Sequence, residues 1–191
     1  MVVKNLISAT ISGLLLSAVV GSAPAAAQQA KSLASDSAFI VKAGSAGVLQ
    51  VKLGQLAEKK GNSPAVVEFG KRMAADYSKT NEELKTAAKQ AGFPAPVLSR
   101  QDQQIFDRFN SMGRSSFDKN YMAQTVTGHS DAVRLFQQES KDGRVQSLKQ
   151  LASKMLPEME QRLNVATETA RSVGVDVAAA TSKSTEGSAS Y

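Results

Sequence analysis

Residues 66–92 read VVEFGKRMAADYSKTNEELKTAAKQAG, and their apolar side chains recur every three or four positions. This period places the apolar side chains on one face of an α-helix, because an α-helix has ~3.6 residues per turn. Ser63 and Pro64 precede the stretch as an N-cap and a first-turn proline, and Gly92 ends it. The stretch therefore predicts a long amphipathic helix. Its apolar face consists of Val66, Phe69, Met73, Leu84, Ala87 and Ala91.

The segments on either side have the same pattern and predict further helices. No run of alternating β-branched residues indicates a strand. Four long amphipathic helices, joined by short links and one crossover of ~20 residues, predict an all-α four-helix bundle with a short extra helix in the crossover. Besides the helix that ends at Ala91, the expected helices cover residues 36–60, 99–112 (the short one), 116–141 and 144–173.

The two ends of the chain differ in composition from this core. Lys4 and the apolar run 6–20 are followed by small residues, which predicts a secretory signal cleaved after Ala27. The run is shorter than the ~20 apolar residues of a membrane-spanning helix. The end of the chain is rich in Gly and Ser and poor in apolar residues. The predicted organisation is a signal peptide over 1–27, a flexible leader over 28–35, the helical domain over 36–173 and a disordered tail over 174–191.

The composition excludes several kinds of functional site. The chain has no Cys and one His, which excludes disulfides, thiolate-bound zinc, iron–sulfur clusters, multi-histidine metal sites and a cysteine nucleophile. Ser130 directly follows His129 and points to another helix face, and no nucleophile elbow is present, which excludes a serine hydrolase. The net charge is +6, but Lys and Arg are interspersed with Asp and Glu, unlike the aromatic and basic pattern that binds nucleic acid.

One polar side chain interrupts each long apolar stripe near the middle of its helix. These side chains belong to Gln50, Tyr77, His129 and Arg162, which we call the core polar layer. In a bundle the helical period brings all four to one level, and we expect them to hydrogen-bond one another, because an unpaired buried polar group costs ~1–3 kcal/mol. Three roles fit the layer: fixing the helix register or reaching water from the stripe edge, binding a ligand or metal, or catalysis.

The residue types of the layer differ from those of a di-iron centre. Such a centre takes a Glu from each of two helices and a Glu-x-x-His motif from each of the other two. Here Val126 stands three positions before His129, the first helix offers Gln50, and Arg162 would repel a cation. We therefore expect no resident metal or cofactor.

Several segments stand in a specific order along the chain. They are AFIVKAGSAGVLQVKLGQLAEKKG (38–61), VVEFGKRMAADYSKTNEELKTAAKQAG (66–92), FDKNYMAQTVTGHSDAVRLFQ (117–137) and LPEMEQRLNVA (156–166). Over residues 36–170 the chain resembles the bacterial secreted family catalogued as domain of unknown function 4142. The resemblance implies a ferritin-like bundle and a metal-binding set at the layer, with Glu at position 50 and His at positions 77 and 162. Of that set, this chain keeps only His129.

Together these patterns predict a periplasmic or secreted helical-bundle protein that is not an enzyme. Its expected role is structural or binding, in the envelope or in stress. The alternative is a metal- or small-ligand-binding protein that uses the bundle core around His129. A third possibility is a peripheral protein whose cationic faces associate weakly with anionic envelope surfaces. We expect no nucleic acid as a partner and no transmembrane segment in the mature chain.

Overall fold

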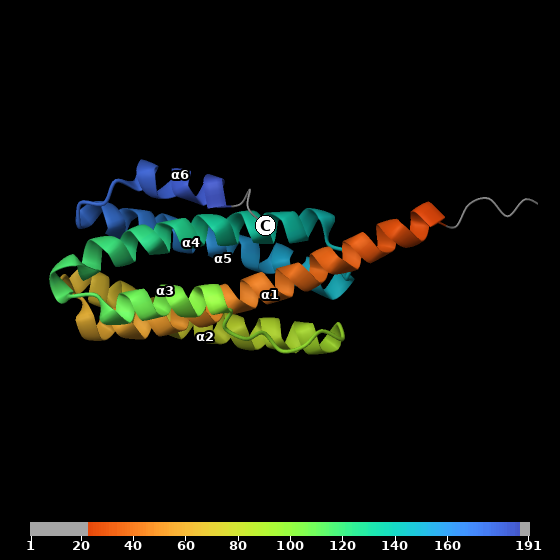
Figure 1. Cartoon of the computed structure of the whole chain (residues 1–191), viewed down its shortest axis with the longest axis horizontal. Coiled ribbons are helices and arrows are strands. Elements are labelled where there is room, and N and C mark those ends of the chain that lie inside the picture. The colour runs from red at the N-terminus through yellow and green to blue at the C-terminus, as the bar shows by residue number, and fades with distance from the viewer. Residues whose placement is uncertain (1–22, 188–191) are drawn as a thin grey trace, which may run out of the picture.

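A computed structural model describes the backbone of residues 23–187 and the side chains of residues 34–182. Within this range the chain is all-helical and has no strand, which confirms the predicted class. None of the helices described combines the length and the apolar composition needed to cross a membrane. In chain order the helices are α1 (Ala23–Lys60), α2 (Pro64–Gln90), α3 (Arg100–Ser111), α4 (Arg114–Asp142), α5 (Gln146–Ser172) and α6 (Val177–Gly187), as Figure 1 shows.

Four long helices lie side by side in two pairs (Figure 1). Helix α1 packs along α2, and α4 packs along α5. The pairs meet where α1 contacts α4 and where α2 contacts α5, so the four helices enclose a common interior. The crossover between the pairs contains α3, which lies on α1, and the last helix, α6, lies against α4.

The first helix begins earlier than the sequence predicts. Helix α1 starts at Ala23, so the segment 28–35, which we expected to be a flexible leader, is helical. Ala and Gln make up half of this segment, and both have high helix propensity. Most of the expected signal peptide, residues 1–22, lies outside the described residues.

The C-terminal end also differs from the prediction. Helix α6 occupies much of the segment 174–191, for which we expected a disordered tail. Ala180 of α6 is buried, and its carbonyl oxygen accepts a hydrogen bond of 2.8 Å from the hydroxyl of Thr127 on α4. Ala180 and Val177, which pack against an apolar cluster of the core, and the Thr127 hydrogen bond therefore hold this helix against the rest of the molecule.

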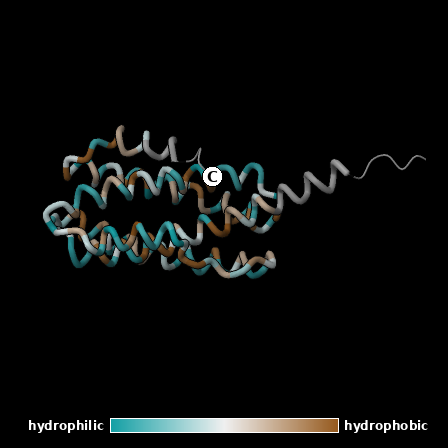
Figure 2. The backbone as a smooth tube through the Cα atoms, in the orientation of Figure 1, coloured by the Kyte–Doolittle hydropathy of each residue, from teal (hydrophilic) through white to brown (hydrophobic). Residues whose placement is uncertain are grey.

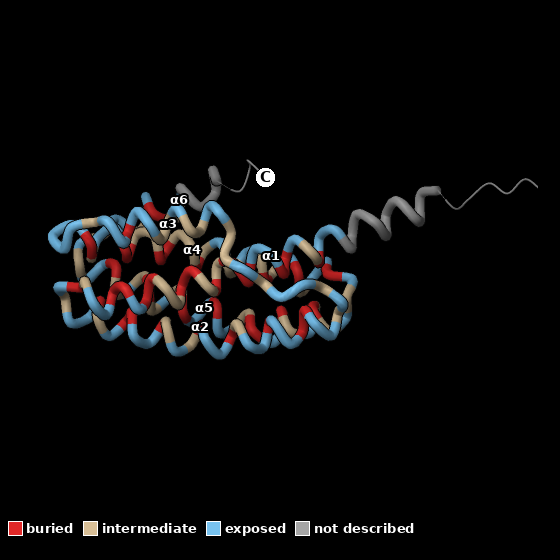
Figure 3. Tube along the Cα trace, turned by 60° about the horizontal axis from the view of Figure 1, so that its bottom comes forward, coloured by how far each residue is buried: buried red, intermediate tan, exposed pale blue. Residues whose placement is uncertain are grey.

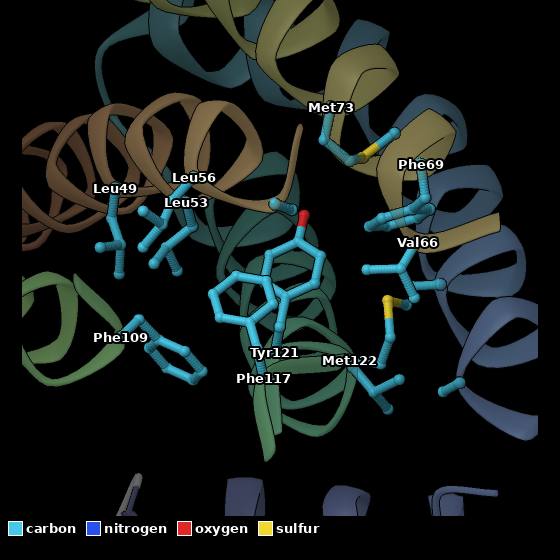
Figure 4. Close-up of a cluster of buried hydrophobic side chains, with 14 of the residues drawn as sticks. Leu49, Leu53, Leu56, Val66, Phe69, Met73, Phe109, Phe117, Tyr121 and Met122 are labelled. Atoms are coloured by element: carbon cyan, nitrogen blue, oxygen red, sulfur yellow. The ribbon is translucent and has the colours of Figure 1, made fainter. Parts of the chain in front are cut away.

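The buried side chains form two apolar clusters at opposite ends of the long helices. Buried residues recur along the inward faces, and apolar residues recur with the same spacing (Figures 2 and 3). The first cluster includes Leu49, Leu53, Phe69, Met73, Phe109, Phe117, Tyr121 and Met122 (Figure 4). The second cluster includes Phe39, Ile40, Leu84, Phe136, Leu148, Met155 and Met159. Burial of this apolar surface, at ~25 cal/mol per Å², is the main force that holds the helices together.

Two glycines allow α1 and α2 to approach closely. A Cβ atom at Gly54 would lie 2.5 Å from the carbonyl oxygen of Gly70. A Cβ atom at Gly70 would lie 2.6 Å from the Cβ of Ala57. Only a residue without a side chain fits at such a contact between backbones. The two glycines therefore set the spacing of the first helix pair beside the first apolar cluster.

Polar side chains fix the connections at one end of the molecule. Asp118 on α4 accepts hydrogen bonds from the backbone N–H groups of Asn62 and Ser63, at 3.1 and 2.8 Å. The Nζ of Lys60 donates to the carbonyl oxygen of Met112 at 2.9 Å, just after the end of α3. These bonds satisfy backbone groups at helix ends, where partners within the helix are missing. They tie the α1–α2 connection to both α3 and α4.

Candidate functional site

The core polar layer lies where the two apolar clusters meet. On α5, Arg162 stands between Met159 of the second cluster and Ala166 of the first. Each long helix contributes one member, and all four members are buried. Their exposed fractions are 5% for Gln50 on α1, 5% for Tyr77 on α2, 0% for His129 on α4 and 8% for Arg162 on α5.

Ring contacts join three members of the layer. The rings of Tyr77 and His129 meet edge to face, with centroids 5.6 Å apart. The guanidinium carbon of Arg162 lies 4.8 Å from the centroid of the Tyr77 ring, which is a cation–π contact. Gln50 on α1 reaches α4 beside His129, because a Cβ atom at Gly128 would lie 3.2 Å from its amide nitrogen. The structure therefore brings all four side chains to one region of the interior.

Most hydrogen bonds of the layer go to groups outside it, whereas from the sequence we expected bonds among all four members. Between members there is a bond of Tyr77 with Arg162. The Tyr77 hydroxyl donates to the sulfur of Met159 at 3.9 Å. The guanidinium of Arg162 donates to the Glu158 carboxylate at 3.2 Å and to the same sulfur at 3.8 Å. The partners of His129 and Arg162 lie one turn away on their own helices, whereas Tyr77 bonds to a sulfur on another helix, α5. The edge-to-face ring contact and the cation–π contact join the members of the layer to one another.

The imidazole of His129 is neutral and has a defined tautomer. Its Nδ1 lies 2.8 Å from the carbonyl oxygen of Thr125, one turn earlier on α4. A carbonyl oxygen can accept a hydrogen bond but not donate one, so Nδ1 carries the proton and Nε2 has the lone pair. Burial lowers the pKa of His129 to about 4; the Thr125 carbonyl opposes this shift, and the charge of Arg162 adds to it. The Nε2 atom has no hydrogen-bond partner among the described residues.

The phenol of Tyr77 is also uncharged. Burial raises the pKa of Tyr77 to about 12, although the charge of Arg162 and a hydrogen bond with it act in the opposite direction. The one charge in the layer is that of Arg162, and its ion-pair partner, Glu158, is 54% exposed. The buried guanidinium thus contacts the Tyr77 ring on one side and the more exposed Glu158 carboxylate on the other.

The donor set of the layer does not fit a divalent metal ion. His129 offers one imidazole lone pair, and the Gln50 amide oxygen is a weak ligand that also lacks a partner. A phenol with a pKa of about 12 stays protonated, and the guanidinium beside it repels cations. Among the side chains described, no group of three or more His, Cys, Asp or Glu residues is placed to hold a metal ion. The metal set that the family resemblance implies is therefore not reproduced by these residues.

Surface hollows lie away from the layer. A groove of about 540 Å³ between α2 and α5 is lined by Glu83, Gln90, Leu151 and Lys154 among others. A second groove of about 380 Å³ lies beside the crossover, with Val48 and Pro96 in its wall. No layer residue lines either groove. Neither groove gives a solute access to His129.

Sequence reasoning missed a second buried polar group, formed by Asp36 on α1 and Glu139 on α4. Both are buried, at 0% and 3% exposure. A signal for it was present, because Glu139 follows Phe136 by three positions and so continues the apolar stripe of α4. Asp36 likewise precedes Phe39 by three positions on α1.

Comparison with known proteins identifies the family that the ordered segments suggested. No curated protein and no solved structure matches the chain. A family match extends over residues 21–169, and this range includes every member of the core polar layer. The chain belongs to the family described as Domain of unknown function (DUF4142).

Proposed function

We propose that the chain is an exported, ferritin-like four-helix bundle that has a structural or binding role in the cell envelope and no enzymatic activity. The contacts of α1 with α2 and α4, and of α5 with α2 and α4, support a bundle with one crossover. The signal-like composition of residues 1–27 supports export.

The burial of the core polar layer, away from both surface grooves, supports the proposal that the chain is not an enzyme. An enzyme needs its reactive groups within reach of a substrate. Here the one imidazole of the chain is fully buried, is covered by the Tyr77 ring and bonds to its own helix. Buried polar residues of this kind more often specify how helices align than carry out chemistry.

A second candidate function, binding of a metal or small ligand at His129, is favoured by one observation. The Nε2 lone pair is buried and has no hydrogen-bond partner among the described residues. The amide oxygen of Gln50 has none either. A species that takes electron pairs from both atoms would relieve two unpaired acceptors, each of which costs ~1–3 kcal/mol.

Elemental analysis separates the two functions. The mature protein is purified without chelators and without a histidine tag, and its iron, zinc, copper and manganese contents are measured beside those of His129→Ala. We expect less than about 0.1 metal ion per chain in both proteins, since the donor set is too weak to retain a metal. About one ion per chain in the wild type that is lost in His129→Ala would establish metal binding instead.

Export has its own test. The full chain is expressed in a bacterium with two membranes, cells are fractionated, and the intact mass of the product is measured. The proposal predicts a periplasmic product whose mass corresponds to cleavage after Ala27. A full-length product that stays in the cytoplasm would contradict export and leave the description of the helices untouched.

A further inference from the structure

The Asp36–Glu139 pair lies where three segments of the molecule meet. Asp36 is on α1, Glu139 is in the last turn of α4, and both face the loop that leads into α5. Oδ1 of Asp36 accepts a hydrogen bond of 3.0 Å from the backbone N–H of Arg144, and Oδ2 accepts one of 3.2 Å from that of Val145. Figure 1 shows this end of α4 and the start of α5 beside α1. The Asp36 carboxylate therefore joins α1 to the α4–α5 loop across more than 100 residues of sequence.

Glu139 is buried between an aromatic pair and the α4–α5 loop. One turn further into the core, the rings of Phe39 and Phe136 meet edge to face at 5.1 Å. On the loop side, a Cβ atom at Gly143 would lie 2.5 Å from Oε1 of Glu139. That oxygen is buried and has no hydrogen-bond partner among the described residues. The site thus gives a carboxylate charge little solvation.

The charged groups near Glu139 come from two neighbouring helices. Asp36 faces it from α1, and Lys149 faces it from α5. The Nζ of Lys149 also donates to the carbonyl oxygen of Lys141, at 2.8 Å. Burial, the charge of Asp36 and a hydrogen bond between the two carboxyl groups raise the pKa of Glu139 to about 7, and the charge of Lys149 opposes them. Near neutral pH Glu139 is therefore protonated for part of the time.

We infer that the Asp36–Glu139 pair is a proton-dependent contact that holds α1 to the α4–α5 loop when Glu139 is protonated and loosens when Glu139 ionises. The protonated carboxyl donates a hydrogen bond to Asp36, and Asp36 keeps its bonds to the two loop N–H groups. The ionised carboxyl places a second negative charge beside Asp36 in a poorly solvated site. The loop N–H groups then exchange between Asp36 and water.

The sign of the pH dependence follows from the two pKa values of Glu139. The pKa is about 7 in the closed contact and near its ordinary value of 4.5 when the contact is open. The closed contact therefore binds the proton more tightly, and opening becomes easier as the pH rises from about 4.5 to about 7 and then levels off. With these values the opening constant rises about tenfold between pH 6 and pH 8.5.

Amide hydrogen exchange at Arg144 and Val145 measures the contact directly. Exchange rates of the mature protein are followed by NMR between pH 6 and pH 8.5 and corrected for intrinsic exchange. We expect the protection of these two amides to fall about tenfold across this range in the wild type. In Glu139→Gln the neutral amide keeps a donor toward Asp36, so protection should change less than about twofold.

Glu160→Gln is the matched control, because Glu160 is an exposed glutamate on α5 outside the pair. In this variant the protection of the Arg144 and Val145 amides should depend on pH as in the wild type. A wild-type protection that stays within twofold from pH 6 to pH 8.5 would overturn the inference. So would a Glu139→Gln variant that repeats the tenfold change, because the titrating group would then be another one.

Discussion

At the scale of single residues, the layer is held by contacts that a helical period does not reveal. The spacing of apolar side chains placed Gln50, Tyr77, His129 and Arg162 on the inward faces of their helices. The partners of these residues were not predictable, because backbone carbonyls lie on every helix and methionines are present on three of the four long helices, so neither leaves a distinctive pattern in the sequence. The ring contacts of Tyr77 with His129 and Arg162 depend on rotamers, which periodicity also does not specify.

Arg162→Met should leave the bundle folded, with a free energy of unfolding within about 1 kcal/mol of the wild type or higher. Methionine keeps the apolar stem against Tyr77 and removes a charge that is only partly compensated by the exposed Glu158. Urea unfolding followed by circular dichroism measures the difference. A loss of more than about 3 kcal/mol would mean that the guanidinium stabilises the core strongly.

His129→Ala and Tyr77→Phe should lower the free energy of unfolding by different amounts. The first change removes a fully buried ring and leaves the Thr125 carbonyl without its side-chain donor, so we expect a loss of about 2–4 kcal/mol. The second change removes a hydroxyl whose acceptor is a sulfur 3.9 Å away, so the loss should be under about 1 kcal/mol. Urea unfolding of both variants checks this order, and equal losses would contradict the contacts described for the layer.

At the scale of the elements, the sequence predicts the inner helices better than the ends. The expected ranges 99–112, 116–141 and 144–173 correspond closely to α3, α4 and α5. The Ser99 side chain caps α3, apolar stripes mark α4 and α5, and tertiary packing agrees with these signals. The stretch before Asp36 is helical in keeping with the propensity of its residues, and helix α6 is placed by its contacts with α4. Such contacts lie far apart in the sequence and cannot be read from local composition.

Gly54→Val tests the close approach of α1 and α2. Its side chain would meet the Gly70 carbonyl oxygen and the backbone nitrogen of Ala74, at 2.5 and 2.9 Å from the Cβ, and neither atom can move away easily. We expect a loss of about 2–4 kcal/mol in the free energy of unfolding, or a separation of the helix pair.

The matched control is Gly113→Ala, because a Cβ atom there would have no neighbour within 4 Å. Its unfolding free energy should stay within about 1 kcal/mol of the wild type. If Gly54→Val melts at the same temperature as this control, the two helices are further apart than the structure indicates.

At the scale of the whole molecule, two buried groups make stability depend on pH in opposite directions. The pKa of His129 is lowered from 6.5 to about 4, so its neutral form stabilises the fold above pH 6.5 and this contribution is lost as the pH falls toward 4. The pKa of Glu139 is raised from 4.5 to about 7, so its contribution is complete below pH 4.5 and is lost as the pH rises through 7.

Variants separate these two contributions. Relative to the wild type, His129→Gln should gain about 2–3 kcal/mol of stability as the pH falls from 6.5 to 4. Glu139→Gln should gain about 1–3 kcal/mol relative to the wild type as the pH rises from 4.5 to 7. Urea unfolding at intervals of half a pH unit measures both differences. If the differences in unfolding free energy between variant and wild type do not change with pH across these ranges, the two side chains are solvated in the folded protein.

The protonation state of the single histidine tests the closed core polar layer most directly. One NMR measurement reports this state, and its signals need no assignment because the chain has one His. Long-range proton–nitrogen correlation spectra of the untagged mature protein give the protonation of both ring nitrogens from pH 5 to pH 8, with and without added Zn²⁺. A closed, metal-free layer predicts a neutral ring with the proton on Nδ1 throughout, unchanged by zinc. A titration midpoint near 6.5, a proton on Nε2, or a shift of Nε2 on addition of zinc would contradict it.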